Sequence, residues 1–552
     1  MPNDKRFYQV PPLLKISLKL FAQSSLLKAL CYWLFAIGSL LIFVIGCASV
    51  KGQGESSEPF YNQNYGQITL FLNGPDRASI DISFSLSAVN VMAEGGAYRE
   101  IMNTPLTINS LNITGRQILL SERALPEGKY EKIKFIVKQA SIKRKDRIAS
   151  LALPPEGIEI PINVMINRNQ NTSLFLHWNV DESIINGYQF NPSINVKVRR
   201  PELSTLLIYV TNEDSNNVSV INRQLDEVVS TVMVGKRPRG VAVNLRKDHL
   251  RVYVANSGSN SVTVIDPTTN KVETEVPVRF GREPEGIAVA SVSPEKEFIF
   301  VTNYGSNNVS VIDGLTYQEM EKVNVGNGPI AVAVDPPVET LLESRSLTPQ
   351  DINILRSYRD KFINIYVANK NSKEVTVLRM DILRNRIEEA FNVAVDWNPI
   401  ALSVDYPRGK VYVANYGYDN LSVINILEIV KGNRTGAVSA ISNVGTSSIG
   451  ITADPSLDRI YLLKEVPGEI MIIRPLLEEQ GLQRIALTPV MGTVPVGSTP
   501  RSLILDPEAR KLYVVNRGSN NVSVIDKTTR REEKVIPVGR KPYGITMFPY
   551  SK

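Results

Sequence analysis

Seven basic residues in short Gly- or Pro-bearing turns are the side chains of this sequence best placed to do chemistry. Arginine can hold a carboxylate or a phosphate through two parallel hydrogen bonds, and lysine adds a point charge. Only three acids, Glu283, Glu285 and Asp396, oppose them in these turns. The candidate anion-binding residues are Lys236, Arg237, Arg239, Arg282, Arg501, Arg540 and Lys541, with Trp397 and Tyr543 as aromatic neighbours. The alternative interpretation is that they are solvated loop charges without a ligand.

No catalytic or metal-binding motif accompanies this charge. The only two histidines, His177 and His249, are far apart in the sequence. There is no CxxCH for covalent haem, no GxSxG, no P-loop, and no GxGxxG between a strand and a helix. We therefore predict no catalytic residue, no metal site and no cofactor, which favours a binding protein over an enzyme.

The turns belong to a repeat that fills residues 203–552. Leu512–Asp526 (LYVVNRGSNNVSVID) alternates apolar and polar residues on both sides of a Gly/Ser/Asn break, as a β-hairpin does. Seven copies occur, and their aromatic residues lie 44, 47, 66, 46, 49 and 52 residues apart. Between hairpins comes an apolar strand that follows a turn such as VGKRP or VGRKP. Four strands in each period of about 45 residues are typical of a propeller blade.

The order of the pieces predicts a closed ring. The first copy begins at its second strand, near Ile208, and the chain ends on a first strand, Tyr543–Pro549. If these two strands pair, seven first strands match seven hairpins. The fold class is therefore all-β, a seven-bladed β-propeller with an N-terminal β-sandwich domain. The first strands would line the channel, and the basic turns would form a half-ring at its mouth, where a concave surface focuses potential on anions.

The phrases YVTN or YVAN, SNNVSVID and VGxxP resemble those of the YVTN-repeat family of microbial surface-layer and envelope propellers. The resemblance covers about residues 203–552 and implies the fold, whereas propellers carry many unrelated activities. Related propellers include lactonases, which place carboxylates around a metal in the channel. Here the first strands read GVAV, GIAV, AVAV, ALSV, GITA, SLIL and GITM, without a carboxylate. Asp335, Asp405, Asp454 and Asp506 follow the strands and read as turn residues. A lactonase-type hydrolase stays the alternative function.

One copy carries an insertion, residues 337–362. Thr348 is a candidate N-cap, Pro349 follows it, and Ile352, Leu355 and Tyr358 recur at helical spacing. We expect a short amphipathic helix that either decorates the blade edge or docks the sandwich domain or a partner.

The N-terminus predicts export. Five basic residues precede Ala29–Gly46, eighteen residues without a charge. Val44-Ile45-Gly46-Cys47 resembles the bacterial lipobox, which implies that residues 1–46 are a cleaved signal peptide and that Cys47 is lipidated. An uncleaved membrane helix and a buried structural cysteine are the alternatives. Both leading interpretations put the rest of the chain in the cell envelope. Ala48 and Ser49 favour the outer membrane or cell surface, and an uncleaved signal would mean an inner-membrane anchor.

Residues 47–59 would then form the lipid-bearing cysteine and a flexible tether. Residues 60–200 show seven alternating runs, which predict a β-sandwich. They are Gln67–Leu72, Ile80–Val91, Leu106–Ile113, Lys132–Val137, Ile158–Met165, Ser173–Trp178 and Ile194–Val198. Two phrases, LPEGKYEKIKFIV and LHWNVDESIINGYQFNPSINV, resemble the DUF4382 family of bacterial lipoprotein domains.

The formal charge of +7 would fall to +3 without residues 1–46, which gives no case for nucleic-acid binding. We therefore predict a membrane-anchored envelope lipoprotein that acts as a non-catalytic binding or scaffold module. Its partners would be the membrane, through Cys47, and an acidic polysaccharide or an envelope protein. A structural surface-coat component is a further alternative.

Overall fold

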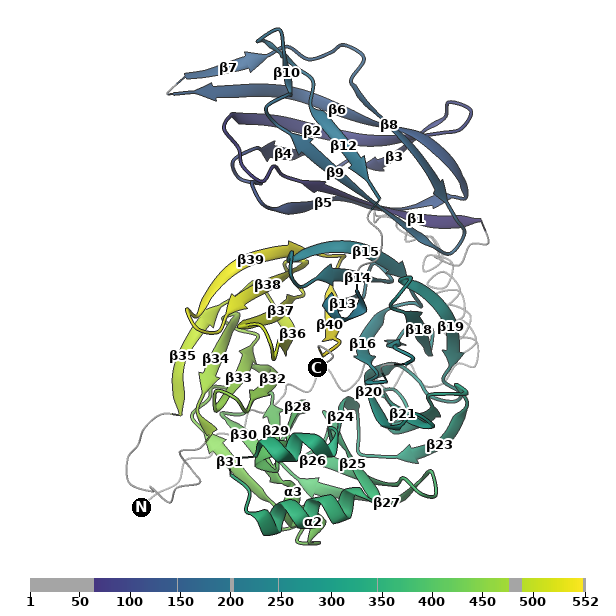
Figure 1. Ribbon diagram of the computed structural model, residues 1–552, viewed down its shortest axis with the longest axis vertical. Helices are drawn as coiled ribbons and strands as arrows, with labels where there is room; N and C mark the ends of the chain where they lie inside the picture. The colour runs from purple at the N-terminus through teal and green to yellow at the C-terminus, as the bar shows by residue number, and fades with distance from the viewer. Residues whose placement is uncertain are drawn as a thin grey trace, which may run out of the picture. The chain divides into compact units, whose positions relative to one another are not determined.

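The computed structural model describes residues 64–198, 203–475 and 489–549, apart from 146, 247 and 345. Residues 60–552 form one compact unit, and within the described ranges nearly all regular structure is β (Figure 1). The predicted signal peptide, Cys47 and the tether lie outside the described residues. Within the ranges given, no helix has both the length and the apolar composition needed to cross a membrane.

Seven four-stranded antiparallel sheets form the propeller, and each has its first strand on the channel. Blade 1 contains β40 (Pro542–Met547), β13 (Leu207–Asn212), β14 (Asn217–Asn222) and β15 (Glu227–Met233). Blade 2 contains β16 (Pro238–Val243), β17 (Val252–Asn256), β18 (Ser261–Asp266) and β19 (Lys271–Pro277). Blade 3 contains β20 (Pro284–Ser293), β21 (Lys296–Asn303), β22 (Asn308–Asp313) and β23 (Glu319–Asn324). Blade 4 contains β24 (Pro329–Val334), β25 (Phe362–Asn369), β26 (Glu374–Asp381) and β27 (Arg386–Ala394).

Blade 5 contains β28 (Pro399–Asp405), β29 (Lys410–Asn415), β30 (Asn420–Asn425) and β31 (Val438–Ser442). Blade 6 contains β32 (Ser448–Asp454), β33 (Arg459–Lys464), β34 (Glu469–Ile473) and β35 (Val490–Pro495). Blade 7 contains β36 (Pro500–Leu505), β37 (Lys511–Asn516), β38 (Asn521–Asp526) and β39 (Arg531–Pro537).

The last strand closes the ring, as the repeat order predicts. β40 pairs antiparallel with β13, so strands from opposite ends of the propeller share blade 1 (Figure 1). Phe548, directly after β40, is buried and meets Tyr209 edge-on at 6.1 Å between ring centroids. The seven-bladed propeller is therefore confirmed.

The Asn residues of the SNN break have two structural roles. Asn216, Asn260, Asn307 and Asn520 have positive φ, which tight turns require and Asn tolerates. The Asn216 side chain also accepts a 2.8 Å hydrogen bond from the backbone N–H of Arg237, in the turn that leads to the next blade. Hairpin turns and inter-blade turns are thereby held together on one side of the ring.

The sixth copy departs from the repeat at one buried position. In six blades the second strand, which is the first strand of the hairpin, ends with an Asn. In blade 6 the corresponding strand, β33, ends with Lys464 instead. The Lys464 ammonium donates to the carbonyl oxygens of Val444 (2.7 Å) and Gly445 (2.6 Å) and to the Ser448 hydroxyl (3.1 Å). Burial lowers the pKa of Lys464 to about 8, because those neutral acceptors do not restore its hydration.

We expect Lys464 to make the free energy of unfolding increase as the pH rises above 8. Its folded-state pKa lies below the ordinary 10.5, so above pH 8 the unfolded chain binds more protons and the free energy of unfolding increases. Compared with Lys464→Met, the wild-type chain should gain about 1–2 kcal/mol between pH 8 and 9.5. Denaturant titrations followed by tryptophan fluorescence would measure this difference. Lys271→Met, on exposed β19, is the matched control, and a pH-independent difference at Lys464 would contradict the expectation.

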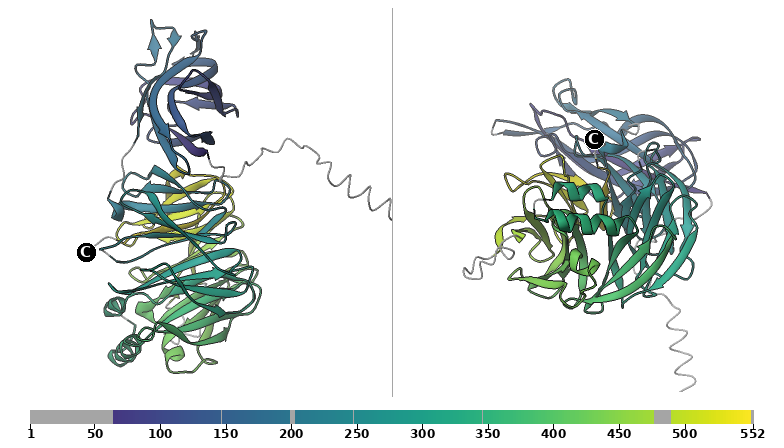
Figure 2. Two further views of the ribbon diagram at one scale, coloured as in Figure 1. Left: turned by 90° about the vertical axis from the view of Figure 1, so that its right-hand side faces the viewer. Right: turned by 60° about the horizontal axis from the view of Figure 1, so that its bottom comes forward.

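The insertion contains η3 (Val338–Glu343) and α2 (Pro349–Arg359), and α2 begins at the predicted Thr348 N-cap. The Thr348 hydroxyl accepts from the Asp351 N–H at 3.2 Å. α2 lies beside α3 (Ile426–Val430), a short helix that the sequence analysis did not predict (Figure 2). Leu355 is buried in a cluster with Tyr366 and Ile426 of blades 4 and 5, so this face of the helix packs on the blade edge. η2 (Ser204–Leu206) and η4 (Tyr406–Arg408) are the other short helical turns described here.

The sandwich domain has two packed sheets, and all seven predicted strands are present. One sheet has the order β12 (Ser193–Lys197), β9 (Asn171–Asn179), β1 (Tyr65–Asn73), β5 (Gln117–Pro126). The other contains β3 (Tyr98–Met102), β2 (Asp81–Ala93), β6 (Gly128–Arg144), β7 (Arg147–Leu151), β4 (Leu106–Asn109) and β8 (Ile158–Ile166). β10 (Ile184–Ile185) and β11 (Gln189–Phe190) form a small extra pair. Residues such as Ile68, Phe84 and Trp178 fill the core between the sheets.

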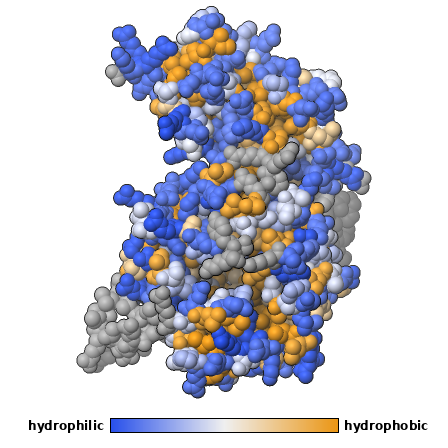
Figure 3. Space-filling model, in the orientation of Figure 1, coloured by the Kyte–Doolittle hydropathy of each residue, from blue (hydrophilic) through white to orange (hydrophobic). Residues whose placement is uncertain are grey.

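Side chains of the sandwich contact blades 1 and 7 of the propeller. The stacked rings of Phe71 and Phe175, with centroids 5.4 Å apart, belong to the same apolar cluster as Ile208 and Tyr513. The Gln117 amide accepts from the Val228 N–H at 3.0 Å and donates to its carbonyl at 3.2 Å, so it satisfies both groups of an outer-strand residue. Hydrophilic and hydrophobic residues are interspersed over the visible face of both domains (Figure 3).

Candidate ligand-binding channel

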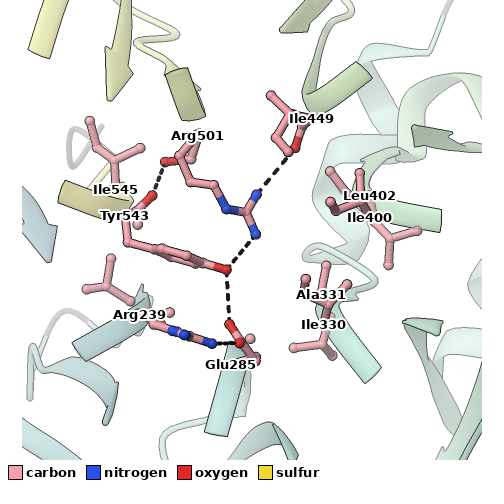
Figure 4. Close-up of a pocket in the computed structure, with 18 of the residues that line it drawn as sticks. Arg239, Glu285, Ile330, Ala331, Ile400, Leu402, Ile449, Arg501, Tyr543 and Ile545 are labelled. Atoms are coloured by element: carbon pink, nitrogen blue, oxygen red, sulfur yellow. Dashed lines mark hydrogen bonds and ion pairs between the residues drawn. The ribbon is translucent and has the colours of Figure 1, made fainter. Parts of the chain in front are cut away.

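An inner ring of seven residues surrounds the channel entrance. Each first strand begins with a Pro or Ser, and the residue after it contributes to the ring. In the order of blades 1 to 7, the inner ring is Tyr543, Arg239, Glu285, Ile330, Ile400, Ile449 and Arg501. The ring is divided in two, because blades 7, 1, 2 and 3 supply the polar residues and blades 4, 5 and 6 supply isoleucine. Figure 4 shows the two halves facing each other across the channel.

Two further layers continue the channel inward. The layer after the inner ring contains only small residues: Gly544, Gly240, Gly286, Ala331, Ala401, Gly450 and Ser502. The next contains only aliphatic residues: Ile545, Val241, Ile287, Val332, Leu402, Ile451 and Leu503. The three layers enclose a cavity of about 260 Å³, slightly below the usual range for small-molecule sites. The small residues let the first strands pack closely, because a Cβ on Gly240, Gly286 or Gly544 would meet the backbone of the neighbouring first strand at 2.4–2.9 Å. The aliphatic layer provides an apolar floor.

An outer ring comes from the hairpin turns. The residue that follows the last position of each second strand lines the mouth in five blades: Glu213, Tyr304, Lys370, Glu465 and Arg517. With the inner ring and the turn residues Arg237 and Glu283, they enclose a mouth of about 390 Å³. The sequence analysis missed this ring, because it considered only the turns that lead into the first strands.

A chain of polar contacts links the two rings. Glu285 is buried and forms an ion pair with Arg239, and it accepts a 3.0 Å hydrogen bond from the Tyr543 hydroxyl. That hydroxyl also accepts from the Arg501 guanidinium at 2.6 Å (Figure 4). The Arg239 guanidinium of the inner ring also contacts the Glu213 carboxylate of the outer ring at 2.9 Å. Tyr543 therefore has both hydrogen-bonding capacities of its hydroxyl occupied.

Glu213 is the anionic centre of the mouth. It is 3% exposed and contacts Arg237 and Arg239 at 2.9 Å and Arg517 at 2.6 Å. Burial disfavours its ionisation, but the hydrogen bonds from Arg517 and Arg239 and their charges outweigh this and lower the pKa to about 2. The carboxylate is thus ionised at any physiological pH and offsets one of the three arginine charges around it.

Arg501 differs from these arginines. It makes no ion pair with any residue that the structure describes; its neutral partners are the Tyr543 hydroxyl and, at 3.4 Å, the Ile449 carbonyl oxygen. Its guanidinium also lies 4.3 Å from the centre of the Tyr543 ring, a cation–π contact that fixes its orientation. This cation stands at the boundary between the polar half and the isoleucine half of the inner ring.

Four of the nine predicted residues line the channel or its mouth, namely Arg237, Arg239, Arg501 and Tyr543. The other five, Lys236, Arg282, Trp397, Arg540 and Lys541, are exposed in the surrounding turns. Lys541 pairs with Asp214 at 2.7 Å, and the Lys373 ammonium lies 4.8 Å from the Trp397 ring centre. The predicted half-ring of positive charge is therefore corrected: two hairpin-turn acids that the sequence prediction did not count, Glu213 and Glu465, line the same mouth, and a third, Asp214, pairs with Lys541.

The prediction that first strands carry no carboxylate is wrong for blades 3, 5 and 6. β20 begins at Pro284, so Glu285 belongs to the strand and lies at the channel entrance, and β28 and β32 end at Asp405 and Asp454. The four aspartates at or just after the far ends of the first strands are not simple turn residues either, since all are buried and ion-paired. Asp335 pairs with Arg359, Asp405 with Arg408, Asp454 with Lys527 and Asp506 with Arg223. Within the described ranges, no three His, Cys, Asp or Glu side chains form a group that could hold a metal ion.

Comparison with known proteins identifies part of the sandwich. Residues 76–197 match the family model of a domain of unknown function, DUF4382, as predicted. A search of curated protein sequences found no match.

Several solved structures are similar in fold to 60–62% of the chain. They include a hydrazine synthase from Kuenenia stuttgartiensis, 19% identical over 60% of this chain and 94% of that one, with a TM-score of 0.45. A functionally unknown protein from Desulfotomaculum acetoxidans is 10% identical over 62% and 99%, with a TM-score of 0.46. A candidate 6-phosphogluconolactonase from Bacteroides fragilis is 15% identical over 62% and 98%, with a TM-score of 0.45. We take no activity from these likenesses.

Proposed function

We propose that this chain is an exported, membrane-anchored binding protein whose propeller takes an anionic ligand at the channel mouth. The observation that carries the proposal is Arg501, a partly buried arginine at the entrance of a cavity, whose described partners are all neutral. A guanidinium in a concave, partly desolvated site binds a carboxylate or phosphate more strongly than an exposed one does.

The anchoring part of the proposal rests on the sequence alone. The uncharged stretch Ala29–Gly46 and the lipobox-like residues before Cys47 support export, lipidation of Cys47 and attachment to the outer membrane or cell surface. We expect mass spectrometry of the chain extracted from membranes to show Cys47 as the N-terminal residue, with a diacylglycerol on its thiol. A chain that retains residues 1–46 with an unmodified Cys47 would favour the uncleaved anchor.

We place binding before catalysis because the polar groups of the inner ring already bond to one another. Glu285 accepts from Arg239 and Tyr543, so it is poorly placed to act as a free base. A lactonase-type hydrolase remains the alternative. Metal-dependent turnover of lactones by the full chain, abolished by Glu285→Gln, would support that alternative and contradict the binding proposal.

The direct test uses the full chain in phospholipid nanodiscs and polygalacturonate as the anionic probe. We expect binding that weakens with salt and falls about tenfold in Arg501→Met, which keeps the length of the side chain but removes its charge. Lys271→Met, on the outer strand β19, removes an equal charge away from the channel and should bind as the wild type does. Equal binding by Arg501→Met would refute the proposed site, and charge reversal at Arg237 and Arg540 would show whether the outer turns contribute.

A further inference from the structure

We infer that the ligand of this channel is a small amphipathic carboxylate, with its charged group at Arg501 and an aliphatic body over the isoleucine half of the inner ring. This inference rests on the proposed function, because it names the ligand class of the same site. It comes from the division of the inner ring and from the two layers beneath it. Neither feature would be needed for a ligand that touched only the charged mouth.

The position of Arg501 sets where the anion lies. Its neighbour on one side is Tyr543, which already bonds to Glu285, and its neighbour on the other side is Ile449. Next to Ile449 around the ring come Ile400 and Ile330. An anion bound to Arg501 therefore has a polar wall on one side and a continuous aliphatic wall on the other. Figure 4 shows Ile449, Ile400 and Ile330 on the side of the channel opposite Tyr543 and Arg239.

A cavity of about 260 Å³ between the inner ring and the aliphatic layer gives the aliphatic body its space. The small residues let the first strands pack closely, because a Cβ on Gly240 or Gly544 would meet the first strand of the next blade at 2.4 Å. The walls that a ligand can touch are therefore the inner ring and the aliphatic layer. Leu402 and its equivalents then close the cavity with an apolar floor. A chain of four to six carbons can be buried there, whereas a sugar would leave hydroxyl groups without partners against this wall.

A ligand with a positively charged head group fits this site less well. A cationic amphiphile would need a free carboxylate at the inner ring, and Glu285, the only carboxylate of that ring, is buried and occupied by Arg239 and Tyr543. The charges that line the mouth also favour an anion, since five basic residues face four acidic ones. Arg501 is the basic residue of the inner ring that is left for a ligand.

Titration calorimetry on the full chain in nanodiscs can test this inference with hexanoate, butanoate and hexylamine. We expect hexanoate to bind about fifteenfold more tightly than butanoate, since each buried methylene adds a factor of about four. Hexylamine should not bind. Arg501→Met in the same nanodiscs supplies the background for lipid partitioning and should weaken hexanoate binding at least tenfold. Ile400→Asn, which replaces part of the aliphatic wall by an amide and leaves the charges in place, should weaken hexanoate binding about tenfold.

The outcomes separate this inference from the proposed function. Arg501-dependent binding of polygalacturonate without binding of hexanoate would overturn the inference and leave the function standing. Equal affinities for butanoate and hexanoate, or unchanged hexanoate binding in Ile400→Asn, would also overturn it. If neither probe binds, both the inference and the proposed function fail.

Discussion

A chain that ends at Gly539, and so lacks β40, is expected to lose cooperative folding of the propeller. β40 is the inner strand of blade 1, and its pairing with β13 joins the two ends of the ring. Without it, Met547 and Phe548 leave two separate apolar clusters, and each such loss costs about 3–5 kcal/mol. The sum is comparable with the total stability of an ordinary domain.

The control for this deletion is a chain that ends at Pro549, which keeps all of β40. We expect that chain and the full-length chain to unfold in one steep thermal transition, and the shorter chain to aggregate or to melt without a transition. Circular dichroism and size-exclusion chromatography would measure both properties. A monomeric Gly539-terminated chain with a normal transition would show that closure of the ring contributes little.

The propeller could be predicted because its determinants are local and repeated. Alternation over five or six residues fixes each strand, and Asn216 and its equivalents take the positive φ of the turn. Even the closure by β40 follows from counting strands. The sixth hairpin shows how robust this is: Lys464 breaks the pattern, yet its ammonium group finds three acceptors and β33 still pairs with β34.

Strand β5 of the sandwich shows where alternation fails. Gln117 and Glu122 are polar residues of β5 that do not simply face solvent. In the structure Gln117 bonds to Val228 and Glu122 accepts from Ser215 and Asn217 of the propeller. A strand face that meets polar groups of another domain looks like surface in the sequence, so β5 was not predicted.

The channel could be predicted only in part, because its residues come from two kinds of turn. The turns before the first strands stand out by their Pro and basic residues, and they led to Arg239, Arg501 and Tyr543. Glu213 lies in a hairpin turn, and hydrogen bonds between this turn and the inter-blade turns, such as that from its own N–H to the Lys541 carbonyl oxygen at 3.0 Å, hold it at the mouth. The variable position after the repeated Asn was the signal that could have revealed it.

Replacing Glu213 by Gln is expected to lower the free energy of unfolding and to strengthen the binding of anions. The pKa of Glu213 is about 2 in the folded chain, below the ordinary 4.5, so its stabilising effect is complete above pH 4.5 and is lost as the pH falls toward 2. At pH 7, Glu213→Gln should therefore lower the free energy of unfolding by about 3 kcal/mol. Acid titration should close this gap, because the wild-type chain loses the same contribution below pH 4.5.

The same change would leave Arg237, Arg239 and Arg517 with one negative charge fewer between them. Polygalacturonate should then bind Glu213→Gln more tightly than the wild type and with a steeper dependence on salt, because more cationic groups face the probe. Glu532→Gln, on exposed β39, makes the same change of charge away from the mouth and should alter neither stability nor affinity. Denaturant titration and calorimetry on the same preparations would measure both effects. If Glu213→Gln is destabilised without any gain in affinity, Glu213 only fixes the arginines in place. If the affinity also rises, Glu213 limits the positive charge that the mouth presents to an anion as well.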